Sequence, residues 1–263
     1  MDELTPKSAE RLSELYRSGD WGLDPELAAA YLEVRFPATQ AVLKRVIEEA
    51  PPGQSLLDFG AGPGCDLDYA TITRVEHNPH IFKIGKKRHP KDEWLTDLPK
   101  IPHDLVLASY SLGESPQSLD ALWSLTKIAL IIIEPGTPQG YQNILSFRSQ
   151  IIEQGGFVKA PCPHENPCPL QKGWCHFGTT VQRTQKHRLL KSGTLGWEEE
   201  KYSFVILTRE KPERYSRILH VPQKRKGHLK LTLCQEDGIN ECTFTKKEER
   251  YKEFKKKRWG DFL

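Results

Sequence analysis

The stretch Asp58-Phe59-Gly60-Ala61-Gly62-Pro63-Gly64 carries the strongest indication of how this chain folds. It continues a short apolar run, 55–59, that has the composition of a buried strand. Glycines at alternate positions let the backbone turn sharply after a strand and approach a ligand closely, with backbone N–H groups facing that ligand. The stretch therefore predicts a strand followed by a ligand-binding turn, the opening unit of an α/β fold.

An acidic residue, Glu76, ends the next apolar run, eighteen positions after Asp58. In nucleotide-binding α/β folds, an acid at about this spacing accepts hydrogen bonds from ribose hydroxyls. The loop lacks the G-x-G-x-x-G spacing of dinucleotide sites, and the helix expected over 66–70 is short for seating a pyrophosphate. We therefore predict a nucleoside site, the alternative being a glycine-rich turn without a ligand. The predicted contacts are Asp58, Gly60, Gly62, Gly64, Glu76 and, at the end of a later strand, Ser109.

The rest of the chain alternates between short apolar runs and longer amphipathic stretches. Apolar residues at helical spacing in 27–50, with a break at Pro37, predict a helical N-terminal cap over 1–50, followed by one domain over 51–263. Strands that alternate with helices favour a parallel, doubly wound sheet. The expected strands are 72–76, 105–109, 129–134 and 202–208, and the expected helical stretches are 81–88, 118–127 and 141–154.

Composition limits the class of protein. The chain has 263 residues, of which 37% are apolar and 28% charged, as in one large α/β domain. Its acidic start, Met1-Asp2-Glu3, lacks the features of an export signal or a transit peptide. The longest apolar stretch, 128–133, is far shorter than the roughly 20 residues that cross a bilayer, so we expect a soluble protein with no membrane partner. Six cysteines without a secretory signal indicate a reducing compartment.

Three of these cysteines, Cys162, Cys168 and Cys175, fall within fourteen residues. The surrounding segment, 156–200, is rich in Pro, Cys, His and basic residues and has no clear period, so we interpret it as an insertion held by something other than a core. The fourth cysteine, Cys234, lies beyond the next predicted strand, which can return the chain to the other three. Together they predict a four-cysteine metal site.

Zinc and iron–sulfur are the two candidate occupants. His164 and His176 lie in the same segment, and mixed Cys/His sets are common for zinc, but zinc sites favour C-x2–4-C spacing. The wider C-x5-C-x6-C spacing, with proline after two of the cysteines, suits a 4Fe–4S cluster, whose four iron corners are separated. We favour the cluster and keep zinc as the alternative. Reduced structural thiols are the better interpretation of Cys65 and Cys242.

The C-terminal tail, 246–263, is strongly basic. Its first thirteen residues hold eight Lys and Arg against three Glu, although the net charge of the whole chain is only +3. The cations would neutralise phosphates, while the interleaved Tyr251, Phe254 and Trp259 would stack on bases or anchor to a protein surface. A solvated helix face is the alternative interpretation.

The loop at 58–64 resembles the nucleotide loop of class I methyltransferases, an acidic residue followed by x-G-x-G-x-G. Further segments carry a more specific resemblance together with this loop: DFGAGPG (58–64), LVLASYSLGE (105–114), IIIEPGTPQGY (131–141), APCPHENPCPL (160–170), WCHF (174–177) and RWGDFL (258–263). Together they resemble the methyltransferase-like family associated with the mitochondrial small ribosomal subunit, which has bacterial relatives. The resemblance runs from about Ala28 to the C-terminus.

This resemblance implies a class I, Rossmann-like methyltransferase fold that binds S-adenosylmethionine and acts on, or docks to, small-subunit ribosomal RNA during assembly. It also implies a 4Fe–4S cluster held by four cysteines, which by position are Cys162, Cys168, Cys175 and Cys234. We expect a monomer, located in the cytoplasm of a bacterium or in the mitochondrial matrix of a eukaryote, and the acidic start favours the former.

Methyl transfer is not assigned to any residue. Exocyclic-amine methylation requires acceptors that orient the amino group for in-line attack, usually an Asn/Asp-Pro-Pro-aromatic motif after the fourth strand. Here the chain reads Ser109-Tyr110-Ser111-Leu112 at that point. Enzymatic activity is therefore left open, and the alternative function is a catalytically inactive, iron–sulfur or zinc-containing structural factor that binds the ribosome.

Overall fold

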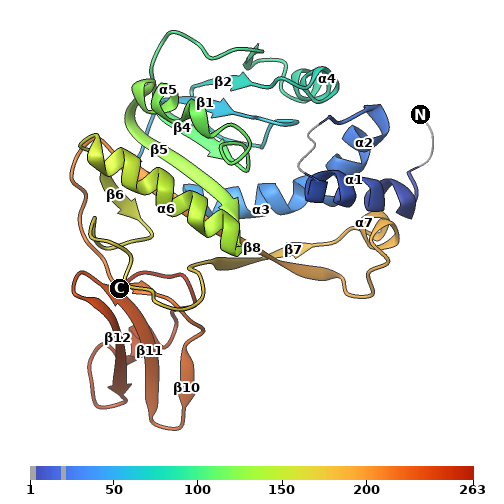
Figure 1. The fold of residues 1–263 in the computed structure, drawn as a ribbon. Coiled ribbons are helices and arrows are strands. Elements are labelled where there is room, and N and C mark those ends of the chain that lie inside the picture. Colours follow the sequence, from blue (N-terminus) through green and yellow to red (C-terminus); the bar gives the residue numbers. More distant parts are fainter. Residues whose placement is uncertain (1–3, 19–21) are drawn as a thin grey trace. The chain divides into compact units, whose positions relative to one another are not determined.

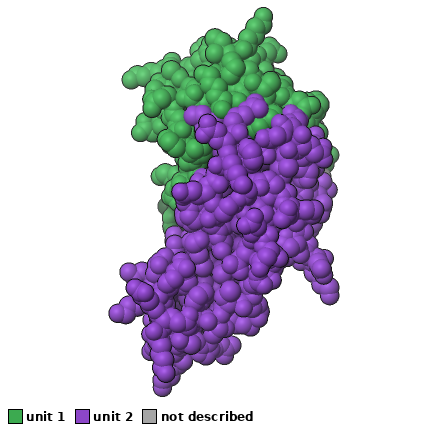
Figure 2. All heavy atoms as spheres, turned by 90° about the vertical axis from the view of Figure 1, so that its left-hand side faces the viewer, with its two compact units in different colours: residues 1–127, 179–200 green, residues 128–178, 201–263 purple. Residues whose placement is uncertain are grey.

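A computed structural model describes residues 4–18 and 22–263, and the acidic start at 1–3 lies outside the described residues. The chain divides into two compact units, which Figure 2 colours separately. Unit 1 comprises residues 1–127 and 179–200, and unit 2 comprises residues 128–178 and 201–263. Within the described ranges, no helix is long and apolar enough to cross a bilayer.

Unit 1 contains a parallel sheet in which the strands lie in the order β3-β2-β1-β4 (Figure 1). The interior residues of β4 are fully buried, as expected for parallel strands covered on both faces. This strand order is that of the first half of Rossmann-like sheets, and it confirms the predicted α/β fold of the methyltransferase type. The strands are β1 (Ser55–Phe59), β2 (Thr71–Val75), β3 (Glu93–Leu95) and β4 (His103–Ser109).

Helices precede and connect these strands. The sequence predicts a break at Pro37 between two helices, but the break lies at Arg35. Pro37 instead occupies the first turn of the second helix, where a proline is tolerated. A further helix, α1, precedes this pair within the predicted helical cap. The helices of this part of unit 1 are α1 (Pro6–Ser18), α2 (Pro25–Val34), α3 (Phe36–Ile47), α4 (Pro79–Arg88) and α5 (Leu119–Ser124), and a 3-10 turn covers Pro116–Ser118.

The N-terminal helices belong to the same unit as the sheet, whereas the sequence predicted a separate cap over 1–50. The side chain of Asn78, after β2, donates to the carbonyl of Leu23 at 3.0 Å. The side chain of Gln40 on α3 accepts the N–H of Asp66 at 2.9 Å. The helix predicted over 66–70 is wrong, because these residues form no helix. The N–H of Asp66 is taken by a side chain of α3 instead of a helical carbonyl.

The segment 156–200 does not form one insertion, because it is divided between the units. Its second half extends from the end of β7 (Phe177–Gln182) through α7 (Gln185–Leu190) to the start of β8 (Trp197–Thr208). Arg183 donates its backbone N–H to the carbonyl of Gly196 at 2.9 Å and closes this arm. Leu190 packs into a core with apolar residues of α1 and α2. The arm is thus held by a hydrophobic core that the sequence did not reveal.

Unit 2 contains the rest of β8, which pairs antiparallel with both β5 (Thr126–Pro135) and β6 (Phe157–Ala160). Between them runs α6 (Pro138–Glu153), which begins three residues before the predicted helix. The hydroxyl of Thr137 accepts the N–H of Gly140 at 3.1 Å and caps it, and proline occupies the first turn.

A second, smaller sheet follows in unit 2, with β9 and β11 paired and β10, β11 and β12 side by side (Figure 1). Its strands are β9 (Arg217–Ile218), β10 (Gln223–Arg225), β11 (His228–Gln235) and β12 (Gly238–Thr245), and the short helix α8 (Tyr251–Phe254) follows. Tyr251 and Phe254 are 7% and 1% exposed and pack against the leucines of β11. The prediction that these two rings stack on bases is therefore wrong.

Candidate functional site

The glycine loop after β1 has a left-handed backbone at all three predicted glycines, with φ of +66° at Gly60, +58° at Gly62 and +77° at Gly64. Residues with a side chain rarely adopt this conformation. A Cβ at Gly60 would also lie 2.3 Å from the Cβ of Ser111, and one at Gly64 would lie 2.6 Å from the Cδ2 of His89. Packing therefore requires glycine at two of the three positions.

Gly62 differs, because there is room for a Cβ at this position, which would make only an ordinary van der Waals contact. The nearest atom is the hydroxyl oxygen of Tyr31, 3.8 Å away. Tyr31 lies on α2, so the N-terminal helices border the loop on this side, and burial raises the pKa of Tyr31 to about 12. The sequence predicts the nucleoside in this space, beside the backbone of Gly62.

Glu76 follows β2 and lies against the glycine loop. Its Oε2 accepts a hydrogen bond from the N–H of Gly62 at 2.9 Å, and its Oε1 accepts one from the N–H of Asn78 at 2.7 Å. Burial raises the pKa of the Glu76 carboxyl. Each carboxylate oxygen has two lone pairs, so the acid keeps capacity to accept a further bond from a hydroxyl. The structure thus brings together Gly62 and Glu76, which the sequence predicts to contact the same nucleoside.

Asp58 is placed differently from the other predicted contacts. It is buried in β1, and its Oδ2 lies 2.8 Å from Nη1 of Arg74 on β2, whose Nε lies 2.7 Å from Asp92. Burial raises the pKa of Asp58, and the Arg74 guanidinium opposes that rise. The carboxylate therefore ties β1 to β2 below the loop, and a direct contact with a cofactor stays a prediction.

Ser109 ends β4, and its buried hydroxyl has no hydrogen-bond partner within the described part of the chain. The next residue, Tyr110, has φ of +58°, a left-handed conformation that is uncommon for a bulky side chain. The guanidinium of Arg35 lies 5.1 Å from the centre of the Tyr110 ring and pairs with Glu200 at 2.7 Å. The end of β4 thus presents a free hydroxyl and a strained tyrosine held by a cation.

Sequence reasoning missed Arg35, Tyr110 and Glu200. Tyr110 had a local signal, since it stands where the methyl-transfer motif is expected. Arg35 and Glu200 are 165 positions apart, and no local pattern pairs residues at such a separation.

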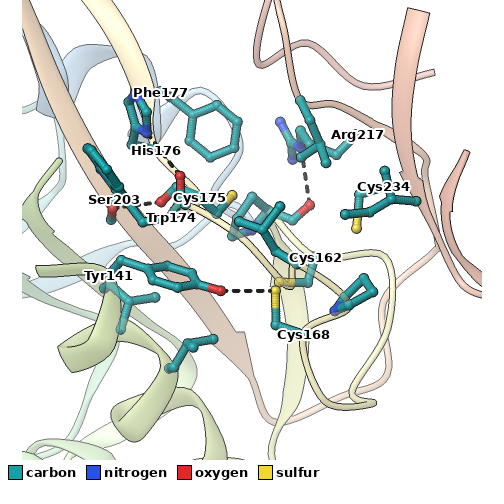
Figure 3. A pocket seen from close by; sticks show the side chains of 18 of the residues that line it. Tyr141, Cys162, Cys168, Trp174, Cys175, His176, Phe177, Ser203, Arg217 and Cys234 are labelled. Atoms are coloured by element: carbon teal, nitrogen blue, oxygen red, sulfur yellow. Dashed lines mark hydrogen bonds between the residues drawn. The ribbon is translucent and has the colours of Figure 1, made fainter. Parts of the chain in front are cut away.

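All four predicted cysteines line one cavity of about 390 Å³ in unit 2 (Figure 3). Cys162 and Cys168 lie in the loop after β6, Cys175 lies just before β7, and Cys234 lies on β11. The hydroxyl of Tyr141 on α6 donates to the Sγ of Cys168 at 3.2 Å. The juxtaposition expected from the chain's return after β8 is therefore present.

The surroundings of Cys162, Cys175 and Cys234 raise the pKa of their thiols. Burial raises the pKa of Cys162, and that of Cys175 rises further because the neighbouring cysteines add to the effect of burial. The pKa of Cys234 rises to about 12 for the same two reasons. In the part of the chain that the structure describes, no group of three or more His, Cys, Asp or Glu side chains is arranged to hold a metal ion.

Two buried arginines border the same cavity, Arg148 on α6 and Arg217 on β9. Arg148 donates from Nη2 to the carbonyls of His164, at 2.6 Å, and Asn166, at 2.9 Å, so it fixes the loop between two cysteines. Its Nε is buried without a hydrogen-bond partner among the described atoms. The positive charges of both arginines lower the pKa of Cys162 and so oppose the effect of burial on that pKa. Sequence reasoning did not identify either arginine.

Aromatic and imidazole rings complete the wall. The rings of Trp174 and His176 stack with centroids 5.3 Å apart, and His176 meets the edge of Trp259 at 5.4 Å. The Nε1 of Trp174 donates to the carbonyl of Gly136 at 2.9 Å. The two candidate zinc-binding imidazoles, those of His164 and His176, both line the cavity. Trp259, one of the three aromatic residues of the basic tail, thus belongs to the cysteine cavity.

Comparison with known proteins finds one matching family and several relatives. Residues 25–263 match the family described as "Mitochondrial small ribosomal subunit Rsm22". The human protein named "Ribosome assembly protein METTL17, mitochondrial" is 32% identical, over 90% of this chain and 62% of its own length. "Rsm22-cox11 tandem protein 2, mitochondrial" of Schizosaccharomyces pombe is 23% identical, over 91% of this chain and 43% of its own length. The chain thus spans less than two thirds of these relatives.

Solved structures share only the general fold with this chain. A TehB-like SAM-dependent methyltransferase from Corynebacterium glutamicum is 14% identical, with a TM-score of 0.41, over 78% of this chain and all of its own.

Proposed function

Because this chain belongs to the Rsm22 family of the mitochondrial small ribosomal subunit, we propose that it takes part in assembly of a small ribosomal subunit. In this proposal it binds S-adenosylmethionine in unit 1 and docks on small-subunit ribosomal RNA. The family match over 25–263 is the observation that carries the proposal, and the human relative named as a ribosome assembly protein supports it.

The geometry of the glycine loop supports the cofactor. Gly62 has room for a Cβ, Glu76 lies within hydrogen-bonding distance of its backbone, and the Ser109 hydroxyl at the end of β4 is unused by the described residues. We propose that the ribose hydroxyls bind Glu76 and that the backbone of Gly60, Gly62 and Gly64 lies against the nucleoside.

We propose docking without methyl transfer as the primary activity. The end of β4 holds Tyr110 in a strained conformation against Arg35, at the place where a methyl-acceptor motif is expected. A second candidate, an RNA methyltransferase, is favoured by the cofactor site. Incubating the protein with methyl-labelled S-adenosylmethionine and small ribosomal particles separates the two, because label in the RNA would establish the enzyme.

We propose that Cys162, Cys168, Cys175 and Cys234 hold a 4Fe–4S cluster, and the donor set fits that group. Four thiols, one of them buried and three half-buried, share one cavity, and two buried guanidinium groups supply positive charge beside them. The positive charge of Arg148, which is buried beside Cys162, would complement the thiolates that bind a cluster. Such a cluster would link the loop after β6 to β11 and would stabilise the fold of this region. Zinc stays the alternative occupant.

The cluster is tested by anaerobic purification of Cys168→Ser beside Cys242→Ser. Cys242 is the matched control, because it lies on β12 against the small core and does not line the cavity. We expect brown protein with broad absorption near about 400 nm for the wild type and for Cys242→Ser. Cys168→Ser should be colourless. Colourless wild-type protein with stoichiometric zinc would refute the cluster and establish zinc as the occupant.

The ribosomal role is tested by tagging the protein in its own host and sequencing the RNA that co-purifies with it. We expect enrichment of small-subunit ribosomal RNA over large-subunit RNA, and accumulation of immature small subunits when the gene is deleted. Equal recovery of both RNAs, together with normal subunits in the deletion strain, would refute the assembly role.

Location and association belong to the same proposal. The relatives are named as mitochondrial proteins, which supports a location in the mitochondrial matrix if the source is a eukaryote. For a bacterial source the proposed location is the cytoplasm. We propose a monomer whose partner is the ribosomal particle rather than a membrane.

A further inference from the structure

Positive charge is concentrated in the last fifty residues of the chain. Residues 214–263 hold fourteen Lys and Arg against seven Asp and Glu, a net charge of +7. The whole chain carries +3, so the remaining residues carry −4. The segment therefore has an electrostatic character opposite to that of the rest of the protein, although the total charge conceals it.

Strand pairing gathers part of this charge at one end of the small sheet. The run 224–226 lies on β10 and the turn that follows it, and Lys246 and Lys247 follow β12. His228 lies opposite Thr245 in the β11–β12 register, and the N–H of Lys246 donates to the carbonyl of Gly227 at 3.0 Å. Figure 1 shows the β10–β11 turn and the end of β12 at the same end of the sheet. We call this group the basic tip: Lys224, Arg225, Lys226, Lys246 and Lys247.

The five side chains of the basic tip are exposed and have no acidic partner. None of them forms an ion pair with a carboxylate in the described ranges. Two of the acids near the basic tip are engaged elsewhere, since Glu241 pairs with Lys230 at 2.6 Å and Glu248 accepts the backbone N–H of Thr245 at 2.6 Å. Five like charges in one place repel one another, and a polyanion relieves that repulsion.

The basic tip stands on a packed base. Leu229, Leu231 and Leu233 of β11 are nearly fully buried, and they pack with Tyr251 and Phe254 of α8. Two of the tail's three aromatic rings, Tyr251 and Phe254, are therefore buried in this core, and Trp259 lies at the cysteine cavity. The remaining recognition is by charge, and contacts to phosphates position a protein on RNA without reading its sequence.

We propose that the basic tip binds the phosphate backbone of RNA and orients unit 2 on it. This inference rests on the proposed function and names the surface that makes the contact. A membrane rich in anionic lipid presents similar charge. We choose RNA because the chain belongs to a family of the small ribosomal subunit. The contact is independent of RNA sequence and weakens with salt, because each phosphate contact releases counterions.

The test measures binding of the full chain to an in vitro transcript of small-subunit ribosomal RNA at several salt concentrations. One variant, Lys224→Glu/Arg225→Glu/Lys226→Glu, reverses the first run, and another, Lys246→Glu/Lys247→Glu, reverses the second. The matched control is Lys86→Glu/Lys87→Glu, which reverses two exposed, consecutive lysines on α4 in unit 1. Circular dichroism verifies that each variant is folded.

For the tip variants we expect Kd to rise about tenfold or more at about 100 mM KCl, and the slope of log Kd against log salt to fall by about 2 for the triple variant. The control should keep both values. Wild-type binding with unchanged tip variants would overturn the tip and leave ribosomal docking intact. No RNA binding by the wild type would overturn both, as would tip-dependent binding to phosphatidylserine vesicles in place of RNA.

Discussion

Single glycines in the nucleotide loop have different physical roles, although the sequence shows them as one repeating pattern. Gly60 and Gly64 leave no room for a methyl group, whereas a methyl group at Gly62 would make only an ordinary van der Waals contact with Tyr31. A side chain at Gly62 therefore changes the cofactor site more than it changes the packing. Cofactor binding can therefore be tested at Gly62, and the stability of the loop can be tested separately at Gly60.

We predict that Gly62→Arg abolishes the heat of S-adenosylmethionine binding in calorimetry while the protein stays folded. Gly60→Ala should instead lower the free energy of unfolding by about 2 kcal/mol or more, because its Cβ would overlap Ser111. Gly155→Ala is the matched control, since it has φ of +84° with nothing within 4 Å. Equal binding heats in wild type and Gly62→Arg would remove the proposed cofactor site.

Arg148 is the single residue most closely tied to the cysteine cavity. Its guanidinium holds two carbonyls of the cysteine loop and brings a buried charge to the thiols. We predict that Arg148→Met, which removes the charge and both bonds, loses most of its iron after anaerobic purification. Arg148→Lys keeps the charge and should retain more iron. Full iron content in Arg148→Met, measured per chain, would contradict a role in cluster binding.

At the scale of an element, α7 is held by a buried histidine as well as by Leu190. His187 is fully buried, and its Nε2 lies 3.3 Å from Oε1 of Glu198, whose carboxylate also pairs with Arg183. Burial lowers the pKa of His187, and Glu198 opposes this effect. The helix is therefore built around a neutral imidazole at neutral pH.

Acid should weaken this element. Because the folded pKa of His187 lies below its unfolded value of about 6.5, the unfolded state binds the proton first as pH falls below that value. His187 then contributes a loss of stability of up to about 1.4 kcal/mol per pH unit, until the folded pKa is reached. We predict a shallower dependence of unfolding free energy on pH between 7 and 5 in His187→Gln, measured by denaturant titration. Identical slopes would refute it.

At the scale of the whole molecule, the two candidate sites share no residue. The predicted contacts to the nucleoside, from Asp58 to Ser109, all lie in unit 1, and the cysteine cavity is lined only by residues of unit 2. Sites without shared partners usually respond independently to mutation.

We predict that Cys168→Ser binds S-adenosylmethionine with the affinity of the wild type, and that Gly62→Arg keeps its full iron content. Calorimetry and iron analysis on the same two preparations check both statements. A loss of cofactor binding in Cys168→Ser would show that the two units depend on each other.

Local patterns were enough to predict much of the fold and of the candidate sites. Short apolar runs located β1, β2, β4 and β5 to within a few residues, because a buried parallel strand needs continuous apolar side chains. Alternate glycines and an acid at a fixed spacing marked the loop, and the density of cysteines marked the cavity. Each of these signals lies within a short window of sequence.

The features that local patterns missed depend on which distant segments pack together. Arg35 meets Glu200 across 165 positions, and Arg148 reaches a cysteine loop that follows its own helix. The composition of the tail predicts a basic run whose rings contact bases or a protein partner, but Tyr251 and Phe254 fill a core because the leucines of β11 cover them. Sequence thus specified backbone conformations and chemical groups. Tertiary packing determined which of those groups are buried, which are paired and which remain exposed for a partner, because burial and pairing depend on contacts between residues far apart in the chain.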